Sequence, residues 1–211
     1  MDDLYKEKVV DVFSMSTTLI DEIRYADVIA KQSSINKLFP TFDDRVKAVA
    51  GKGGVRLKQV RGDLWTFKVH SGTKDGVWYT NNVKFPNLEE DIRKYAKDKK
   101  LWNKDGTKVD LRKLAVEILF STDVQLYCSC PAFLYYGAAY ILTQRGAKYT
   151  KPENRPPKKR NPSELGAICK HGQLLLDVLP MYATTLSKYI SQYYGDVIED
   201  TENEVKGKKN V

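Results

Sequence analysis

Alternation of apolar and polar residues predicts a small β-sheet in the first half of the chain. Every second residue of the segment 64–70 is apolar or aromatic from Trp65 onward. A period of two is the period of a strand with one buried face. Segments 55–60 and 76–85 flank it and are joined to it by glycine-containing turns. These three segments are therefore expected to form an antiparallel meander with a defined inner face.

A helical spacing of apolar residues, one every three to four positions, predicts helices elsewhere in the chain. The segments with this character are 4–32, 88–99, 110–119, 171–179 and 182–194. Ser and Thr residues interrupt the middle of the first segment, so we expect two helices there rather than one. A short apolar run at 124–127 is expected to be a strand that leads into the first pair of cysteines.

Together these elements predict an α+β fold with three parts. Residues 1–50 form an N-terminal helical region, which ends before the glycine cluster 51–54. Residues 51–195 form an α+β domain with a small antiparallel sheet, a long insert at 131–168 and C-terminal helices. Residues 196–211 are mostly polar and charged, which is typical of a flexible tail.

Composition restricts the class of protein. The 211 residues are 42% hydrophobic, which is enough for a core. The sequence has neither an apolar run long enough to cross a membrane nor the basic-then-apolar pattern of a signal peptide. We therefore expect a soluble, intracellular protein without a membrane partner. The net charge of +8 favours anionic partners, but Lys and Arg are mixed with 27 acids, so bulk charge alone identifies none.

Two pairs of candidate metal ligands use every cysteine in the chain. The pairs are Cys128-x-Cys130 and Cys169-x-His171, whereas the other histidine, His70, has no cysteine near it in the sequence. An odd number of cysteines and the one-residue spacing argue against a disulfide framework. Zinc binds four such ligands in a tetrahedron. We therefore predict that these four residues hold one Zn²⁺ ion; unconnected buried thiols are the alternative.

The residues around these ligands resemble the SWIM zinc finger, whose pattern is Cys-x-Cys, a spacer and Cys-x-His. The resemblance covers roughly residues 64–180. It rests on Tyr127-Cys128-Ser129-Cys130-Pro131-Ala132-Phe133 followed by Cys169-Lys170-His171. It implies strands before the first cysteines and a helix that begins at the second pair. The 38-residue spacer 131–168 is longer than is usual for the family, although the entropy of loop closure grows slowly with length.

The predicted ligand set favours a structural metal over a catalytic one. Four protein ligands fill a tetrahedral shell, whereas a catalytic zinc keeps one position open for water. No His-Glu-x-x-His motif or comparable arrangement of carboxylates accompanies the cysteines. We therefore expect metal binding to be coupled to folding, with no enzymatic activity, no catalytic residue and no small-molecule substrate.

The spacer also carries most of the excess positive charge. It contains seven basic residues against Glu153 and Glu164, a net charge of +5. These are Arg145, Lys148, Lys151, Arg155, Lys158, Lys159 and Arg160. Prolines keep the run 155–162 extended, so it could follow a phosphate backbone while nearby tyrosines stack on bases. Docking of another protein is the alternative use of this surface.

A second resemblance, to proteins of large tailed bacteriophages, runs through the same region. It rests on the segments 130–133, 140–149, 154–157, 160–162 and 166–171. Phage proteins of this kind are usually virion or assembly components. The resemblance implies a zinc-stabilised structural protein that contacts neighbouring virion subunits and, through its basic residues, DNA. The rival hypothesis is a SWIM zinc-finger regulator that binds nucleic acid.

Overall fold

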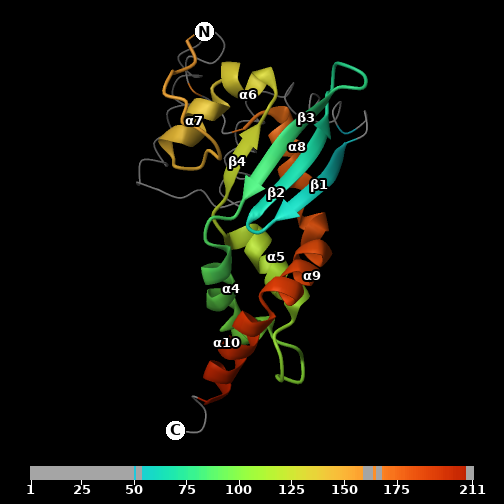
Figure 1. Cartoon of the computed structure of the whole chain (residues 1–211), viewed down its shortest axis with the longest axis vertical. Helices are drawn as coiled ribbons and strands as arrows, with labels where there is room; N and C mark the ends of the chain where they lie inside the picture. Colours follow the sequence, from blue (N-terminus) through green and yellow to red (C-terminus); the bar gives the residue numbers. More distant parts are fainter. Residues whose placement is uncertain (1–49, 51–53, 159–163, 165–167, 208–211) are drawn as a thin grey trace, which may run out of the picture.

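The computed structural model describes residue 50, residues 54–158, residue 164 and residues 168–207. The predicted helices of the segment 4–32, and with them the N-terminal helical region, lie outside these residues. The described part is elongated, with the sheet toward one end and the C-terminal helix at the other (Figure 1).

Four strands form one antiparallel sheet in the order β1-β2-β3-β4. They are β1 (Val55–Arg61), β2 (Leu64–His70), β3 (Trp78–Lys84) and β4 (Gln125–Cys128). The first three strands are the meander that the alternating pattern predicts. The fourth is the predicted strand before the cysteines, shifted by one residue.

The inner face of the sheet is the face that the sequence pattern indicates. Trp65, Phe67 and Val69 are fully buried on it, and Val83 of β3, the partner of Trp65, is buried beside them. A bulge in β1 between Leu57 and Gln59 shifts the register with β2 by one residue. The inner face continues onto β4, where Leu126 lies opposite Val83.

Two helices connect β3 to β4, so the last two strands are paired without being a hairpin. These are α4 (Leu88–Ala96) and α5 (Leu111–Ser121), with the short 3-10 helix η1 (Lys99–Leu101) between them. Asp110 caps α5, because its carboxylate accepts hydrogen bonds from the backbone N–H groups of Arg112 (3.1 Å) and Lys113 (3.2 Å).

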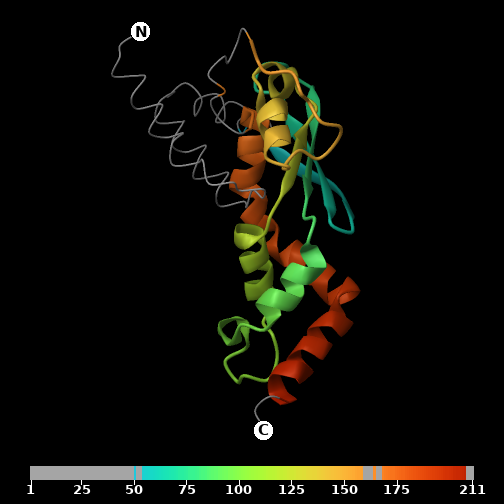
Figure 2. The ribbon, with the colours of Figure 1, turned by 90° about the vertical axis from the view of Figure 1, so that its left-hand side faces the viewer.

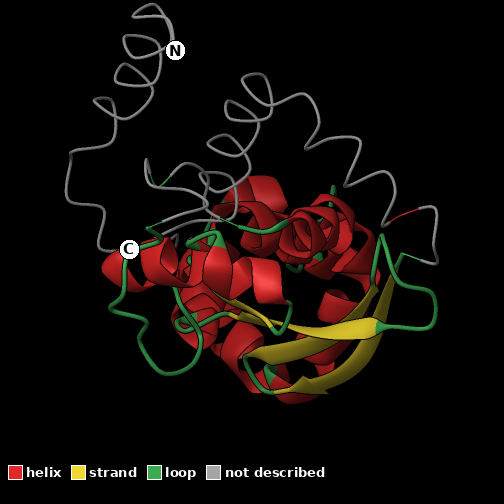
Figure 3. Ribbon diagram, turned by 90° about the horizontal axis from the view of Figure 1, so that it is seen from above, coloured by secondary structure: helices red, strands yellow, loops and turns green. Residues whose placement is uncertain are grey.

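The C-terminal helices cover the inner face of the sheet and extend away from it. They are α8 (Lys170–Val178), the 3-10 helix η2 (Leu179–Tyr182), α9 (Ala183–Tyr193) and α10 (Gly195–Gly207). Helix α8 contacts all four strands, and α9 packs against α5. Figure 2 shows α8 on one side of the strands, and the view along the long axis in Figure 3 shows the helices of the described part gathered beside the sheet.

The expectation of a flexible tail over 196–211 is wrong for residues 196–207, which belong to α10. Ile198, Thr201 and Glu202 are buried, and Val205 is partly buried against the core, at the spacing of one helical face. The Glu202 carboxylate accepts a hydrogen bond of 2.7 Å from the backbone N–H of Val109. Apart from Glu202, the charged residues of this helix, which suggested a tail, are exposed.

The insert 131–168 contains structure that the sequence pattern did not predict. It begins with two short helices, α6 (Pro131–Tyr135) and α7 (Ala138–Gln144). The chain then returns along β4, where Leu126 donates to the Ala147 carbonyl (2.8 Å) and Tyr149 donates to the Leu126 carbonyl (3.0 Å). This segment therefore covers the open edge of β4.

These elements confirm the predicted α+β class. Helices and an antiparallel sheet share a core in which strand residues such as Phe67 pack with helix residues such as Leu175 and Leu186. None of the helices in the described ranges combines the length and the apolar character that crossing a membrane requires.

Candidate metal centre

Hydrogen bonds to β3 hold the first cysteine pair. Cys128 is the last residue of β4 and lies opposite Asn81 of β3. Ser129, between the two cysteines, bonds twice to Thr80: its N–H donates to the Thr80 carbonyl and its hydroxyl accepts from the Thr80 N–H, both at 2.9 Å. The sheet therefore fixes the backbone between the two thiols.

Cys130 turns the chain from the sheet into α6. It is the N-cap residue of this helix, and its sulfur accepts a hydrogen bond of 3.3 Å from the N–H of Phe133. The Cys128 sulfur accepts a similar bond of 3.4 Å from the N–H of Cys130. Backbone N–H groups that point at sulfur stabilise the thiolate form. Each sulfur of this pair therefore has a backbone donor that would stabilise it as a thiolate when a cation is bound.

The second pair lies at the start of α8. Cys169 is the N-cap residue of that helix, and its carbonyl accepts from the N–H of Gln173 at 2.9 Å. His171 lies in the first turn and is only 2% exposed. Because α8 packs across the inner face of the sheet, its N-terminus brings these two residues to the end of β4.

The structure brings the four predicted ligands together. One ligand atom from each of Cys128, Cys130, Cys169 and His171 lies within 4.8 Å of every other, and all four residues are buried. A tetrahedral ion with sulfur at about 2.3 Å requires ligand separations of roughly 3.8 Å, so small movements would complete the shell. All three cysteines are free thiols. The cluster could hold one metal ion and is compatible with a zinc finger.

The imidazole of His171 points to the same conclusion. Both of its ring nitrogens are buried and have no hydrogen-bond partner among the described residues. Leaving a buried polar atom unpaired costs roughly 1–3 kcal/mol. Coordination of a metal by one nitrogen would satisfy it. The ring of Tyr79 lies over the imidazole with centroids 4.7 Å apart and restricts its orientation.

The pKa values of the Cys128 and Cys130 thiols are shifted in opposite directions. Burial, and then contact with Cys130 and Cys169, raises the pKa of the Cys128 thiol. Hydrogen bonding from Cys128, and then from Cys169, lowers the pKa of Cys130. Without a metal, the cluster thus favours a thiolate at Cys130, which accepts hydrogen bonds from the Cys128 and Cys169 thiols. A bound cation would allow all three sulfurs to be deprotonated together.

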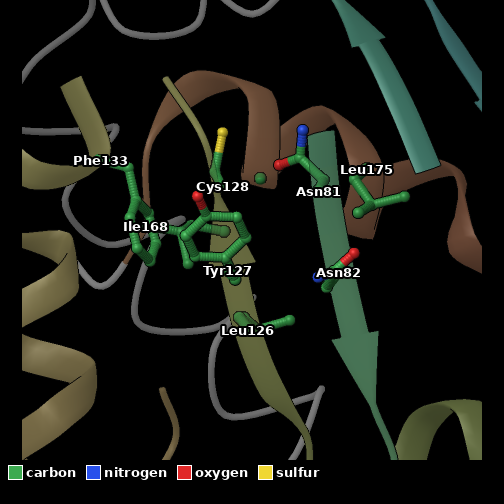
Figure 4. A pocket seen from close by; sticks show the side chains of 9 residues that line it. Asn81, Asn82, Leu126, Tyr127, Cys128, Phe133, Ile168 and Leu175 are labelled. Atoms are coloured by element: carbon green, nitrogen blue, oxygen red, sulfur yellow. The ribbon is translucent and has the colours of Figure 1, made fainter. Parts of the chain in front are cut away.

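Asn81, the cross-strand partner of Cys128, is a buried polar residue beside the candidate ligands that sequence reasoning missed. It is 1% exposed, and the oxygen of its amide has no hydrogen-bond partner among the described residues. Figure 4 shows this amide and the Cys128 sulfur on the same side of a small cavity between β3, β4 and α8. The available signal was a polar residue at an inner-face position of β3, two residues before the apolar Val83.

The basic residues of the insert differ in exposure and in hydrogen bonding, and the structure does not gather them at one point as it does the candidate ligands. Arg155 forms a two-point ion pair with Glu153, with nitrogen to oxygen distances of 2.8 and 2.7 Å. The Lys148 ammonium is bonded to the Thr150 hydroxyl (2.7 Å) and to the Lys151 carbonyl. Arg145 is half-buried, whereas Lys151 and Lys158 are exposed. Lys159 and Arg160 lie outside the described residues.

His70 lies outside the cluster, as expected. It is 6% exposed, its Nδ1 is 2.7 Å from the carbonyl oxygen of Ser71, and its ring meets the Trp78 ring edge to face. Within the described ranges, Cys128, Cys130, Cys169 and His171 are the group of cysteine, histidine and acidic residues placed to share a metal.

Comparison of the chain with known protein families, with curated proteins and with solved structures found no match.

Proposed function

We propose that this protein is a non-enzymatic, zinc-stabilised module of a larger assembly. The observation that carries the proposal is the buried cluster of three thiols and one imidazole, which joins the end of β4 to the start of α8. Each half of the cluster lies on a different element, and the 38 residues 131–168 separate them. A metal at this point would close the insert and dock α8 onto the sheet.

Zinc is the ion that this donor set suits best. Three thiolates and one imidazole in a tetrahedral arrangement are typical of structural zinc, whereas calcium and magnesium require oxygen ligands. Four protein ligands leave no position for a reactive water, which supports a structural role over a catalytic one. The pattern of ligands also supports the resemblance to the SWIM finger on which the proposal draws.

Chelation of the full chain tests this role. Removing zinc should lower the melting temperature, and adding zinc back, but not magnesium, should restore it. A matched pair of variants separates the ligand from a merely buried histidine: His171→Asn should lose the metal, whereas His70→Asn should retain it. A metal-free protein with an unchanged melting temperature would contradict the proposal.

The assembly role is supported by an exposed apolar surface beside the metal cluster. Leu134, Tyr135 and Tyr136 are 40%, 64% and 39% exposed, and they follow Cys130 through α6. Large exposed apolar residues in a group are typical of protein contacts. The metal would hold this surface in place through the cysteine that caps α6. Together with the resemblance to tailed-phage proteins, this surface favours contacts with neighbouring virion subunits.

Co-sedimentation tests the assembly role. A virion component should sediment with purified particles of the phage that encodes it, and the double substitution Leu134→Ser, Tyr135→Ser should release it. The matched control is Met181→Ser, Tyr193→Ser, because these residues are 81% and 60% exposed away from α6. Equal particle content for both variants would contradict a docking role for this surface.

A nucleic-acid-binding regulator is the second candidate function, and the net charge of +8 favours it. A regulator should bind short duplexes with an affinity that falls steeply with salt, and neutralisation of the insert's basic residues Lys158, Lys159 and Arg160 should weaken that binding. An assembly subunit should bind them weakly and remain with its particle.

A further inference from the structure

The outer face of the sheet is not covered by any described helix. Helix α8 lies against the inner face, and β1, β2 and β3 make no comparable contact with another helix on the opposite side (Figure 2). The cations of the outer face are at least partly accessible: Arg56 and Arg61 are exposed, and Lys68 and Lys84 are half-buried. Among the described elements, none therefore separates these cations from a partner.

The strands are free of acidic residues. The four strands contain five Lys or Arg and no Asp or Glu, in a chain that has 27 acids. Lys84 lies 3.6 Å from Asp63 of the β1–β2 turn. Arg56, Arg61 and Lys68 have no carboxylate within ion-pair distance in the part of the chain that the structure describes. Within the described ranges, the positive charge of these three side chains is therefore not neutralised by a carboxylate.

Two of these cations are placed directly opposite each other. Arg56 of β1 and Lys68 of β2 are cross-strand partners. Like charges in this position destabilise a sheet. An anion shared by both side chains would remove the repulsion, so the arrangement fits a surface that binds one.

Neighbouring residues hold both cations in place. The Arg56 guanidinium lies 4.4 Å from the centroid of the Trp78 ring, and the Lys68 ammonium donates to the Thr80 hydroxyl at 2.8 Å. Trp78 is itself supported by the edge of His70. Side chains that are already ordered lose less entropy when they bind a phosphate.

We propose that the outer face of β1, β2 and β3 binds the phosphate backbone of a nucleic acid through Arg56, Arg61 and Lys68. A phosphate chain presents repeated negative charge that a row of unpaired cations can neutralise, and arginine can bind phosphate at two points. Within the insert, Arg155 is already paired with Glu153 and Lys148 is hydrogen-bonded within its own loop, so these two cations are less available to a phosphate than Arg56, Arg61 and Lys68. The proposal does not depend on which ion the cysteines hold, so its failure would leave the metal-based function intact.

Matched charge variants of the full chain test this surface. The sheet variant is Arg56→Gln, Arg61→Gln, Lys68→Gln, and the control is Lys100→Gln, Lys104→Gln, Lys108→Gln, which removes the same charge from exposed residues near η1. The probes are a fluorescein-labelled single-stranded DNA, the duplex of the same sequence and the corresponding RNA. Binding is measured by anisotropy from roughly 50 to 200 mM salt.

The sheet variant should bind at least about tenfold more weakly than the wild type. The slope of log affinity against log salt concentration, here called the salt slope, should fall in magnitude by about 2 on the single strand, because each lost phosphate contact removes about 0.7. The control should keep the wild-type slope. The single variant Arg61→Gln, which lies at an exposed strand end, should lower the slope by about 0.7 and serves if the triple variant folds poorly. Comparison of the three probes identifies the form of nucleic acid preferred.

Three results would overturn the proposal. The first is a wild-type slope for both the triple variant and Arg61→Gln. The second is an equal loss for the control, which would show that only net charge matters. The third is displacement of the DNA by polyglutamate as readily as by unlabelled DNA at equal charge, which would assign the face to an acidic protein.

Discussion

Asn81 of β3 and Cys128 of β4 lie directly opposite each other on the buried face of the sheet. The Asn81 amide is held by one long bond, 3.4 Å from its nitrogen to the Tyr79 carbonyl, and its oxygen has no partner among the described residues. A polar side chain so placed is suited to hydrogen bonding with a ligand sulfur or with the imidazole once a metal is bound. Such outer contacts orient metal ligands.

Asn81→Leu should therefore weaken zinc binding by about 10- to 100-fold while the sheet remains folded. The measurement is competition with a chromophoric chelator, with circular dichroism as the check on folding. Asn82→Leu is the matched control, because Asn82 is the next residue of β3 and pairs with Tyr127 instead. Equal affinities for the wild type and both variants would remove Asn81 from the site.

Glu202→Ala should destabilise the protein by about 1–3 kcal/mol, because the backbone N–H of Val109 would lose its buried acceptor. Glu199→Ala, on the exposed face of α10, should change the free energy of unfolding by less than about 0.5 kcal/mol. Urea unfolding followed by fluorescence measures both. If the two variants were equally stable, α10 would contribute little to the core.

The sheet was predictable because its alternating residues face a single core, whereas α10 and the insert were not. In α10 the inner residues Ile198, Thr201 and Glu202 include only one apolar side chain, so the helical spacing is hidden among charges. Helices α6 and α7 are five and seven residues long, too short for a periodic pattern to be distinguished. Their positions depend on tertiary contacts.

Gly137→Ala should disturb the insert more than a glycine-to-alanine change elsewhere. Gly137 has a φ of +86°, and a Cβ there would lie 2.4 Å from Cγ of Pro157. Gly106 has a φ of +67° with open space around it, so Gly106→Ala isolates the conformational cost of roughly 1–2 kcal/mol. The clash should add about 1–3 kcal/mol. Chemical unfolding and proteolysis of the insert compare the two variants. An equal loss of stability in Gly137→Ala and Gly106→Ala would show that Pro157 moves away from the added Cβ at no cost.

The Glu153–Arg155 pair gives the insert a defined response to acid. The hydrogen bond from Arg155 lowers the pKa of the Glu153 carboxyl from 4.5 to about 2. Because the folded pKa lies below the unfolded one, the pair stabilises the insert fully above pH 4.5 and loses this contribution as the pH falls toward about 2. Carboxyl carbon NMR should record the low pKa, and Arg155→Gln should raise it. A wild-type pKa near 4.5 would contradict the pairing.

The candidate metal ligands were predictable because they are scarce residues in paired spacing, and cysteine and histidine are the usual zinc ligands whatever the surrounding fold. The sequence could not show that Ser129 is hydrogen-bonded to Thr80 or that the ring of Tyr79 packs on that of His171. These contacts depend on the register of β3 and on where α8 docks. Asn81 was missed for the same reason. Only pairing of β3 with β4 places it opposite a ligand.

X-ray absorption at the zinc edge of the purified full chain is the most direct test of the metal centre. The expected result is one zinc per chain with three sulfur neighbours at about 2.3 Å and one nitrogen at about 2.0 Å. Cys169→Ser should remove one sulfur or the metal altogether. A protein without bound zinc, or zinc surrounded only by oxygen and nitrogen, would contradict it.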